Sequence, residues 1–180
     1  NKKHQTYFDE LHAKENENLE KKQALVTQLK ELDLTKLKSN KQWDEATERV
    51  LSIQQEWRTI GFAPKKQNQT IYNEYRELCE AFFKAKTAFY KDMRDEFSEN
   101  LKKKRELIEA AEALKDSIEW TETTNKLIEL QQQWKKIGPV ARKYSDELWK
   151  KFTAACDTFF EAKRVATKEL REQKAQKRAE

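Results

Sequence analysis

The rarest residues of this 180-residue chain occur in pairs that lie 77 positions apart. The chain has only two glycines, Gly61 and Gly138, and its only two cysteines, Cys79 and Cys156, have the same spacing. Four of the five tryptophans repeat it, Trp43 with Trp120 and Trp57 with Trp134. A constant offset among rare residues predicts a tandem repeat, in which one structural unit occurs twice along the chain.

The scarcity of turn-forming residues limits the fold class. With two glycines, two prolines, 38% charged and 37% hydrophobic residues, the composition is typical of long amphipathic helices. Short β-branched runs bounded by turn clusters, which would indicate strands, are not found. We therefore predict an all-α fold with a thin core, in which aromatic residues (11% of the chain) supply much of the buried area.

Each repeat contains a short amphipathic helix followed by glycine. From Trp43 to Ile60 the apolar residues are spaced three or four apart, and Trp120 to Ile137 repeats the pattern. The following Gly61 and Gly138 are expected to end these helices in the left-handed conformation. The segments 39–42 and 116–119 are predicted to cap their starts, the first as a capping box.

A longer helix is expected to connect the repeats. Residues 70–114 contain no glycine, proline or turn cluster, and Asn68 and Ser145 are expected to be N-caps of this helix and of its equivalent in the second repeat. The motifs Asn18-Leu19 and Asn100-Leu101 match at a spacing of 82, as do Tyr7-Phe8 and Phe89-Tyr90. The spacing between matching residues falls from 82 to 77 because the first repeat has extra residues ahead of Trp43. Since insertions are expected in loops, a loop is predicted near residues 33–38.

These observations predict tandem three-helix-bundle repeats joined by a shared long helix into an elongated, spectrin-like rod. Residues 15–92 form the first repeat and 93–170 the second. Residues 1–14 are interpreted as the end of a preceding repeat and 171–180 as the start of a following helix, so we expect the chain to be a segment of a longer protein.

Two stretches resemble a known family. Trp57-Arg58-Thr59-Ile60-Gly61 with Pro64, and Trp134-Lys135-Lys136-Ile137-Gly138 followed by residues 148–152, resemble the bacterial repeats called domain of unknown function 349. The resemblance implies bacterial, cytoplasmic, all-helical arrays, and it implies no established activity. The second copy departs from the first in having Ala141 at the position of Pro64 and Trp149 at that of Tyr72.

Catalytic and metal-binding patterns are weak. His4 and His12 are eight residues apart, whereas a helical metal pair needs a spacing of four, so surface positions are favoured. Cys79 and Cys156 are predicted to be small, buried core residues, which suits a reducing compartment. Two glycines cannot build a phosphate-binding loop. We predict no enzyme activity, cofactor or metal, and no apolar run is long enough to span a membrane.

One duplicated feature is not explained by packing. Lys65-Lys66 and Arg142-Lys143 are 77 apart, and both pairs are expected in the loop just before a long helix. Basic side chains are unfavourable beside the positive end of a helix dipole, so their repetition indicates a site for phosphate of RNA or for an acidic partner helix. The alternative is that these loops are simply polar. Phe62, in the first loop, has no helical stripe to join and is the best candidate for an exposed contact.

Two functions follow from these features. The first is a non-enzymatic interaction or scaffold module of a longer bacterial protein, which binds protein partners along its rod. The second is an RNA- or ribosome-associated module that uses the repeated basic loops. The sequence pI of about 9.0 supports the second, but 37 basic against 32 acidic residues is a modest excess for phosphate binding.

Overall fold

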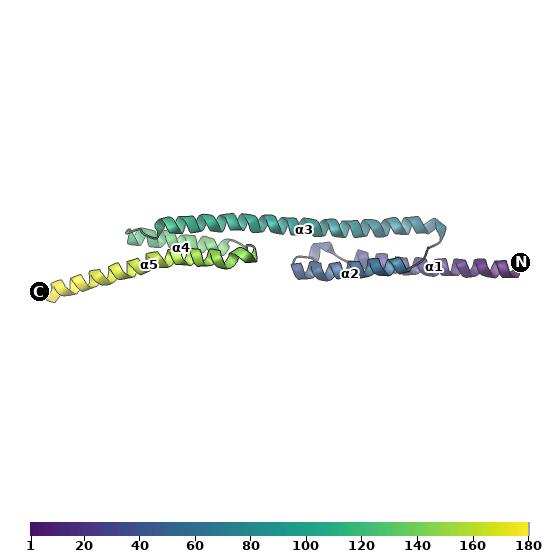
Figure 1. Ribbon diagram of the computed structural model, residues 1–180, viewed down its shortest axis with the longest axis horizontal. Helices are drawn as coiled ribbons and strands as arrows, with labels where there is room; N and C mark the ends of the chain where they lie inside the picture. The colour runs from purple at the N-terminus through teal and green to yellow at the C-terminus, as the bar shows by residue number, and fades with distance from the viewer. Residues whose placement is uncertain (180) are drawn as a thin grey trace. The chain divides into compact units, whose positions relative to one another are not determined.

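The computed structural model describes residues 1–179, in which helices are the only regular elements (Figure 1). The all-α prediction is confirmed. In chain order the elements are α1 (Lys2–Glu31), the 3-10 helix η1 (Leu34–Lys36), α2 (Asn40–Thr59), α3 (Lys65–Leu114), α4 (Trp120–Lys136) and α5 (Arg142–Ala179). The loop predicted near residues 33–38 is confirmed, since η1 lies there.

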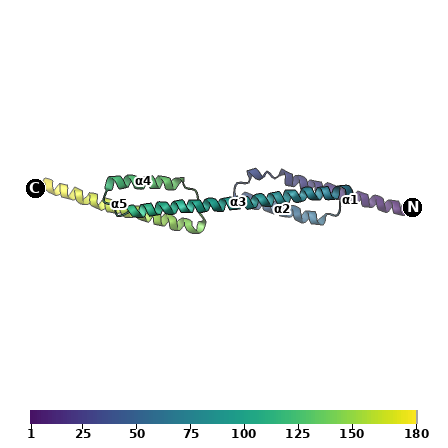
Figure 2. The same ribbon diagram turned by 90° about the horizontal axis from the view of Figure 1, so that it is seen from above.

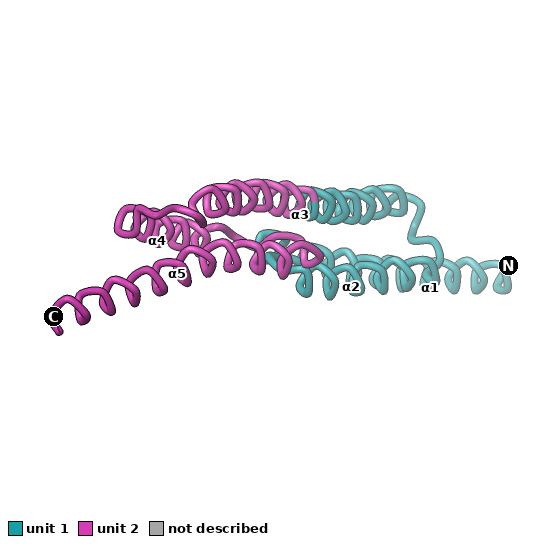
Figure 3. Tube along the Cα trace, turned by 60° about the vertical axis from the view of Figure 1, so that its left-hand side comes forward, with its two compact units in different colours: residues 1–90 teal, residues 91–180 magenta. Residues whose placement is uncertain are grey.

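The chain divides into two compact units, residues 1–90 (unit 1) and residues from 91 onwards (unit 2), coloured separately in Figure 3. The boundary falls inside α3. This helix continues without a break from Lys65 to Leu114, as the sequence predicted for residues 70–114.

In unit 1, α1, α2 and the first half of α3 run beside one another (Figures 1 and 2). Their apolar stripes form one core, and the stripe predicted from Trp43 to Ile60 supplies its α2 side. The buried core residues are Leu25, Val26 and Leu29 of α1, Trp43, Ala46, Val50, Ile53 and Trp57 of α2, and Ile71, Cys79 and Phe82 of α3.

Unit 2 builds its core from the second half of α3, α4, the following loop and α5. Its buried residues are Leu107, Ile108, Ala111, Leu127, Trp134, Val140, Leu148, Phe152, Ala155, Cys156 and Phe159.

The aromatic contacts of the two cores correspond. The Trp57 ring stacks on Tyr75 with centroids 3.9 Å apart, and Trp134 stacks on Phe152 at 4.4 Å. Trp43 lies 5.5 Å from Phe82, and Trp120 lies 5.7 Å from Phe159. The 77-residue offset in the sequence is therefore also an offset between equivalent contacts.

The two short helices begin differently. Ser39 and Gln42 form the predicted capping box at the start of α2. The corresponding prediction for residues 116–119 is wrong. The N-cap of α4 is Glu119, whose side chain makes no capping bond, and the Ser117 hydroxyl accepts a hydrogen bond from the Glu119 N–H (3.2 Å).

The long helices begin earlier than predicted, at Lys65 and Arg142, so Asn68 and Ser145 are not N-caps. The carbonyl of Pro64 accepts from the N–H groups of Gln67 and Asn68, both at 2.9 Å, which starts α3 directly after the proline. Proline suits this position because the first N–H groups of a helix have no partner within the helix. The predicted basic loop pairs consequently lie in first helical turns.

The prediction of left-handed glycines is also wrong, since neither Gly61 nor Gly138 has a positive φ. The short helices end instead at Ile60 and Ile137, which adopt extended backbone angles. Their N–H groups donate to the carbonyls of Trp57 and Trp134, at 3.1 and 3.2 Å. The backbone conformation therefore does not explain why glycine occupies positions 61 and 138, and the reason must lie in an atom packed against them.

Among residues 1–179, no helix has both the length and the apolar character that a membrane crossing requires.

Candidate interaction site at the interhelical loops

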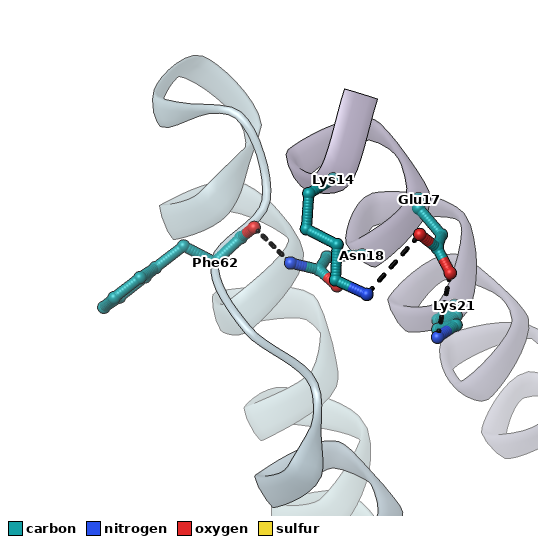
Figure 4. A network of polar contacts seen from close by, with 5 residues as sticks. All are labelled: Lys14, Glu17, Asn18, Lys21 and Phe62. Carbon is teal, nitrogen blue, oxygen red and sulfur yellow. Dashed lines mark hydrogen bonds and ion pairs between the residues drawn. The ribbon is translucent and has the colours of Figure 1, made fainter. Parts of the chain in front are cut away.

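A buried asparagine on α1 holds the loop that follows α2. Asn18 is 5% exposed, and its Nδ2 donates to the carbonyl oxygen of Phe62 at 2.9 Å (Figure 4). A Cβ atom added to Gly61 would lie 3.0 Å from this Nδ2 atom. Gly61 is therefore needed because the Asn18 amide approaches the backbone closely.

Unit 2 repeats this arrangement. Asn100 on α3 is 7% exposed, and its Nδ2 donates to the carbonyl oxygen of Pro139 at 2.8 Å. A Cβ on Gly138 would lie 2.9 Å from Nδ2. The sequence contained a signal for these residues, the match of Asn18-Leu19 with Asn100-Leu101, but no local pattern linked the asparagines to the glycines.

One helical turn further along lies a lysine that covers the second tryptophan of its unit. Lys22 Nζ lies 5.0 Å from the ring centroid of Trp57, and Lys104 Nζ lies 4.9 Å from that of Trp134. Burial lowers the pKa of both lysines, and the ring faces offset part of that cost by cation–π attraction.

In unit 1 the same lysine reaches the start of α3. Lys22 Nζ donates to Oδ1 of Asn68 at 3.4 Å, and the same oxygen accepts from the N–H of Ala63 at 3.1 Å. The loop backbone is thus held from both sides, by Asn18 at Phe62 and by Asn68 at Ala63.

The Phe62 side chain is the exposed part of this fixed loop. Its carbonyl points to Asn18, whereas its ring points away from α1 (Figure 4). The side chain is 77% exposed, which confirms the prediction that Phe62 is an exposed residue. Exposure of a large aromatic ring on a constrained backbone is typical of a contact surface.

A pocket of about 480 Å³ opens beside this loop. It is lined by Leu11, Lys14, Glu15 and Asn18 of α1, Phe62 and Ala63 of the loop, and Lys65, Asn68 and Gln69 of α3.

The charges around the pocket are mixed. Lys14 Nζ lies 3.5 Å from Glu17, and Glu17 also pairs with Lys21 at 3.2 Å (Figure 4). The hydrogen bond from Lys21, together with the charge of Lys14, lowers the pKa of Glu17. The carboxylate of Glu17 and that of Glu15 therefore offset the lysine charge on the α1 side.

The other candidate residues lie in different places. Lys66 is exposed on the first turn of α3 but does not line the pocket. Arg142 and Lys143 lie on the first turn of α5 in unit 2, where Lys143 Nζ is 5.0 Å from the ring centroid of Tyr144. Of the five residues proposed from the sequence, the structure brings together Phe62 and Lys65.

The cysteines and histidines do not line the pocket. Cys79 and Cys156 are buried free thiols, as predicted, and burial raises the pKa of both. His4 and His12 are exposed on α1. Residues 1–179 contain no cluster of three or more histidine, cysteine or acidic side chains that could hold a metal ion.

The chain matches the model of the family described as Domain of Unknown Function (DUF349) over residues 1–66 and again over residues 70–143. It belongs to this family. No curated protein and no solved structure matches the chain.

The two DUF349 matches divide the chain differently from the compact units. Residues 1–66 contain α1, α2 and the loop, and residues 70–143 contain most of α3, then α4 and the next loop. Each match thus covers a long helix, a short helix and a loop. The core of unit 1 also takes Ile71, Cys79 and Phe82 from the second match, so a DUF349 segment completes its core with the long helix that follows it.

Proposed function

We propose that this DUF349 chain is a non-enzymatic, cytoplasmic interaction and scaffold module of a longer bacterial protein, and that it binds protein partners. The observation that carries the proposal is the fixed loop of unit 1. Phe62 presents an exposed ring at a pocket of mixed polar and apolar lining, while its own carbonyl is held by Asn18.

The physical basis is preorganisation. Aromatic anchors supply much of the affinity of protein interfaces, and a partner loses less entropy on binding when the anchor's backbone is already ordered. Asn18 and Asn68 hold the two polar groups of the peptide unit between Phe62 and Ala63, its carbonyl oxygen and its N–H. The adjoining pocket can accept an apolar side chain from the partner.

The charges favour a protein over a nucleic acid. Proteins that bind phosphate backbones concentrate basic residues on one face. At this site Lys14 is paired with Glu17, and Glu15 lines the pocket together with Lys65. A protein segment with an apolar side chain for the pocket and a carboxylate near Lys65 fits this mixture better than RNA does.

The proposal includes the repeat arrangement expected from the sequence, three-helix repeats that share long helices and form a spectrin-like rod. Support comes from α3, which contributes buried residues to the core clusters of both units. At about 1.5 Å per residue, a continuous 50-residue helix is roughly 75 Å long. Small-angle X-ray scattering of the 180-residue chain tests the rod, and a maximum dimension below that helix length would contradict it.

The binding proposal is tested by capture from a nuclease-treated bacterial lysate. We compare the wild-type chain with Phe62→Ala and with Ile118→Ala, a matched control that truncates another exposed apolar residue (75%) in a different loop. A specific protein should be captured by the wild type and by Ile118→Ala, and its recovery should fall at least about tenfold with Phe62→Ala. Equal recovery with Phe62→Ala would show that the Phe62 loop is not the binding site.

The RNA- or ribosome-associated alternative predicts a different result from the same material. Capture would then depend on nucleic acid, weaken by orders of magnitude from low to moderate salt, and be lost when Lys65, Lys66, Arg142 and Lys143 are changed to alanine. Loss of all capture after nuclease treatment, together with loss in this fourfold variant, would replace the protein-partner proposal by the RNA proposal.

A further inference from the structure

The first turns of α1 carry an aromatic face, defined here as His4, Tyr7 and Phe8. Tyr7 is 61% exposed and Phe8 is 49% exposed, with ring centroids 6.0 Å apart and nearly edge-on at 71°. The His4 ring lies 5.9 Å from Phe8. Within unit 1 these turns of α1 extend beyond α2 and the start of α3 (Figures 1 and 2).

The repeat shows what covers such a face elsewhere in the chain. At the offset of 82, Tyr7 and Phe8 correspond to Phe89 and Tyr90 on α3, whose rings are 5.4 Å apart at 79°. Both are partly buried residues packed on the core of unit 1.

The covering element is the start of a short helix. The Phe89 ring lies 5.5 Å from Trp43, in the first turn of α2, and the Tyr90 hydroxyl donates to Oδ1 of Asp44 at 3.4 Å. The two adjacent aromatic residues of the long helix thus contact a tryptophan and the aspartate that follows it in the short helix.

In the family matches too, the first part of a long helix packs on the helices of the match before it. In the DUF349 match over residues 70–143, the part of α3 before the unit boundary packs on the α1 and α2 of the preceding match. The aromatic face of α1 occupies the corresponding part of the match over residues 1–66 at the offset of 82.

We infer that the aromatic face of α1 is a docking surface for a helix pair of the same repeat type, placed ahead of α1 in the chain, with a tryptophan at the start of its short helix. Tyr7 takes the position of Phe89 against that tryptophan. A second folded copy does not offer Trp43 for this purpose, because Phe82 and Phe89 already lie against it at 5.5 Å each. This inference does not depend on partner binding at Phe62.

The test adds such a helix pair to the full chain. A second copy of residues 15–82 is inserted ahead of Asn1, so that Tyr7 follows the added Phe82 at the same separation as Phe89 follows Phe82 in the natural chain. Amide hydrogen exchange of residues 4–12 is then measured by mass spectrometry in the natural and the extended chain. Exchange should slow at least about tenfold in the extended chain, because the docked helices must open before these amides exchange.

The matched control is the extended chain with Tyr7→Ser and Phe8→Ser, in which this protection should be lost. Equal exchange in the natural and extended chains, or full protection in the control, would overturn the inference. An extended chain whose added segment gains no helix by circular dichroism would overturn it too, since α1 would then have failed to complete the added core. Self-association of the natural chain that is lost with Tyr7→Ser and Phe8→Ser would instead assign the face to a second copy.

Discussion

Units 1 and 2 share two contacts of buried or partly buried polar side chains but differ in the residues around them. In both, an asparagine donates to a loop carbonyl and a lysine covers a tryptophan ring. The residues next to these contacts have changed between the units: Phe62 corresponds to Pro139, Asn68 to Ser145, Tyr75 to Phe152 and Glu15 to Phe97.

The comparison separates the requirements of the fold from those of binding. The asparagine–glycine contact is retained because a buried amide needs both its hydrogen bond and the space beside the glycine. The exposed Phe62 ring is not retained, since Pro139 takes its place. Binding at the loop is therefore expected to belong to unit 1, whereas the loop geometry belongs to both units.

The largest expected effect is the loss of the asparagine. Asn18→Ala and Asn100→Ala should each destabilise their unit by about 2 kcal/mol, because a loop carbonyl loses its donor in a partly buried site and the asparagine side chain leaves a gap beside the glycine. Urea unfolding of the two variants measures this, and the two values should agree. A loss below about 0.5 kcal/mol in one unit would show that its loop does not depend on this bond.

The glycine substitutions are expected to cost somewhat less, roughly 1–2 kcal/mol for Gly61→Ala or Gly138→Ala, because the new Cβ meets the asparagine Nδ2 at 3.0 or 2.9 Å. Valine at either position should cost more than about 1 kcal/mol for the same reason. A double-mutant cycle tests this cause, since the penalty of Gly138→Ala should shrink in an Asn100→Ala background. A purely additive result would show that the close approach is not the cause.

At the N-termini of the short helices, one substitution is expected to lower the stability of its unit and another to raise it. Ser39→Ala should destabilise unit 1 by about 1 kcal/mol, because it removes the capping box of α2. Glu119→Ser should stabilise unit 2 by about 0.5–1 kcal/mol, because the new serine would stand three residues before Glu122, in the capping-box spacing. Thermal unfolding measures both, and a destabilising Glu119→Ser would show that Ser117 already serves this helix end adequately.

The smallest expected difference concerns alkaline pH. Burial raises the pKa of Tyr75 to about 12 from an ordinary value of 10.0, whereas Phe152 in unit 2 has no hydroxyl. A raised pKa in the folded state means that the stabilisation is complete below pH 10 and is lost as the pH rises towards 12. Tyr75→Phe should therefore reduce the loss of stability between pH 9 and 11 by about 0.5–1 kcal/mol, a value kept small because the side chain is partly solvated. Identical pH profiles of the wild type and the variant would contradict this.

Several parts of the structure were predictable because their signals are local. Ser39 and Gln42 lie three residues apart, and the interval 70–114 contains no residue that breaks a helix. The start of α3 was misplaced because Asn68 is a good N-cap residue in general, yet its side chain accepts from Ala63 behind it once Pro64 has started the helix. At the candidate site, the exposure of Phe62 was predictable because Phe62 lies in a loop and belongs to the apolar face of no predicted helix. The pocket was not, because its walls come from α1, the loop and α3.

The sequence by itself determined the helical class and the approximate extents of the helices, since periodicity and the few helix-breaking residues act over short stretches of chain, and its 77-residue offset matched equivalent aromatic contacts. The tertiary structure decided why each unit needs its glycine. The Asn18 amide meets the loop across 44 positions of sequence, and such a contact exists only after α1 and α2 have packed against each other. Glycine after a short helix usually indicates a left-handed turn, but here the space beside it is taken by a buried side chain from another helix.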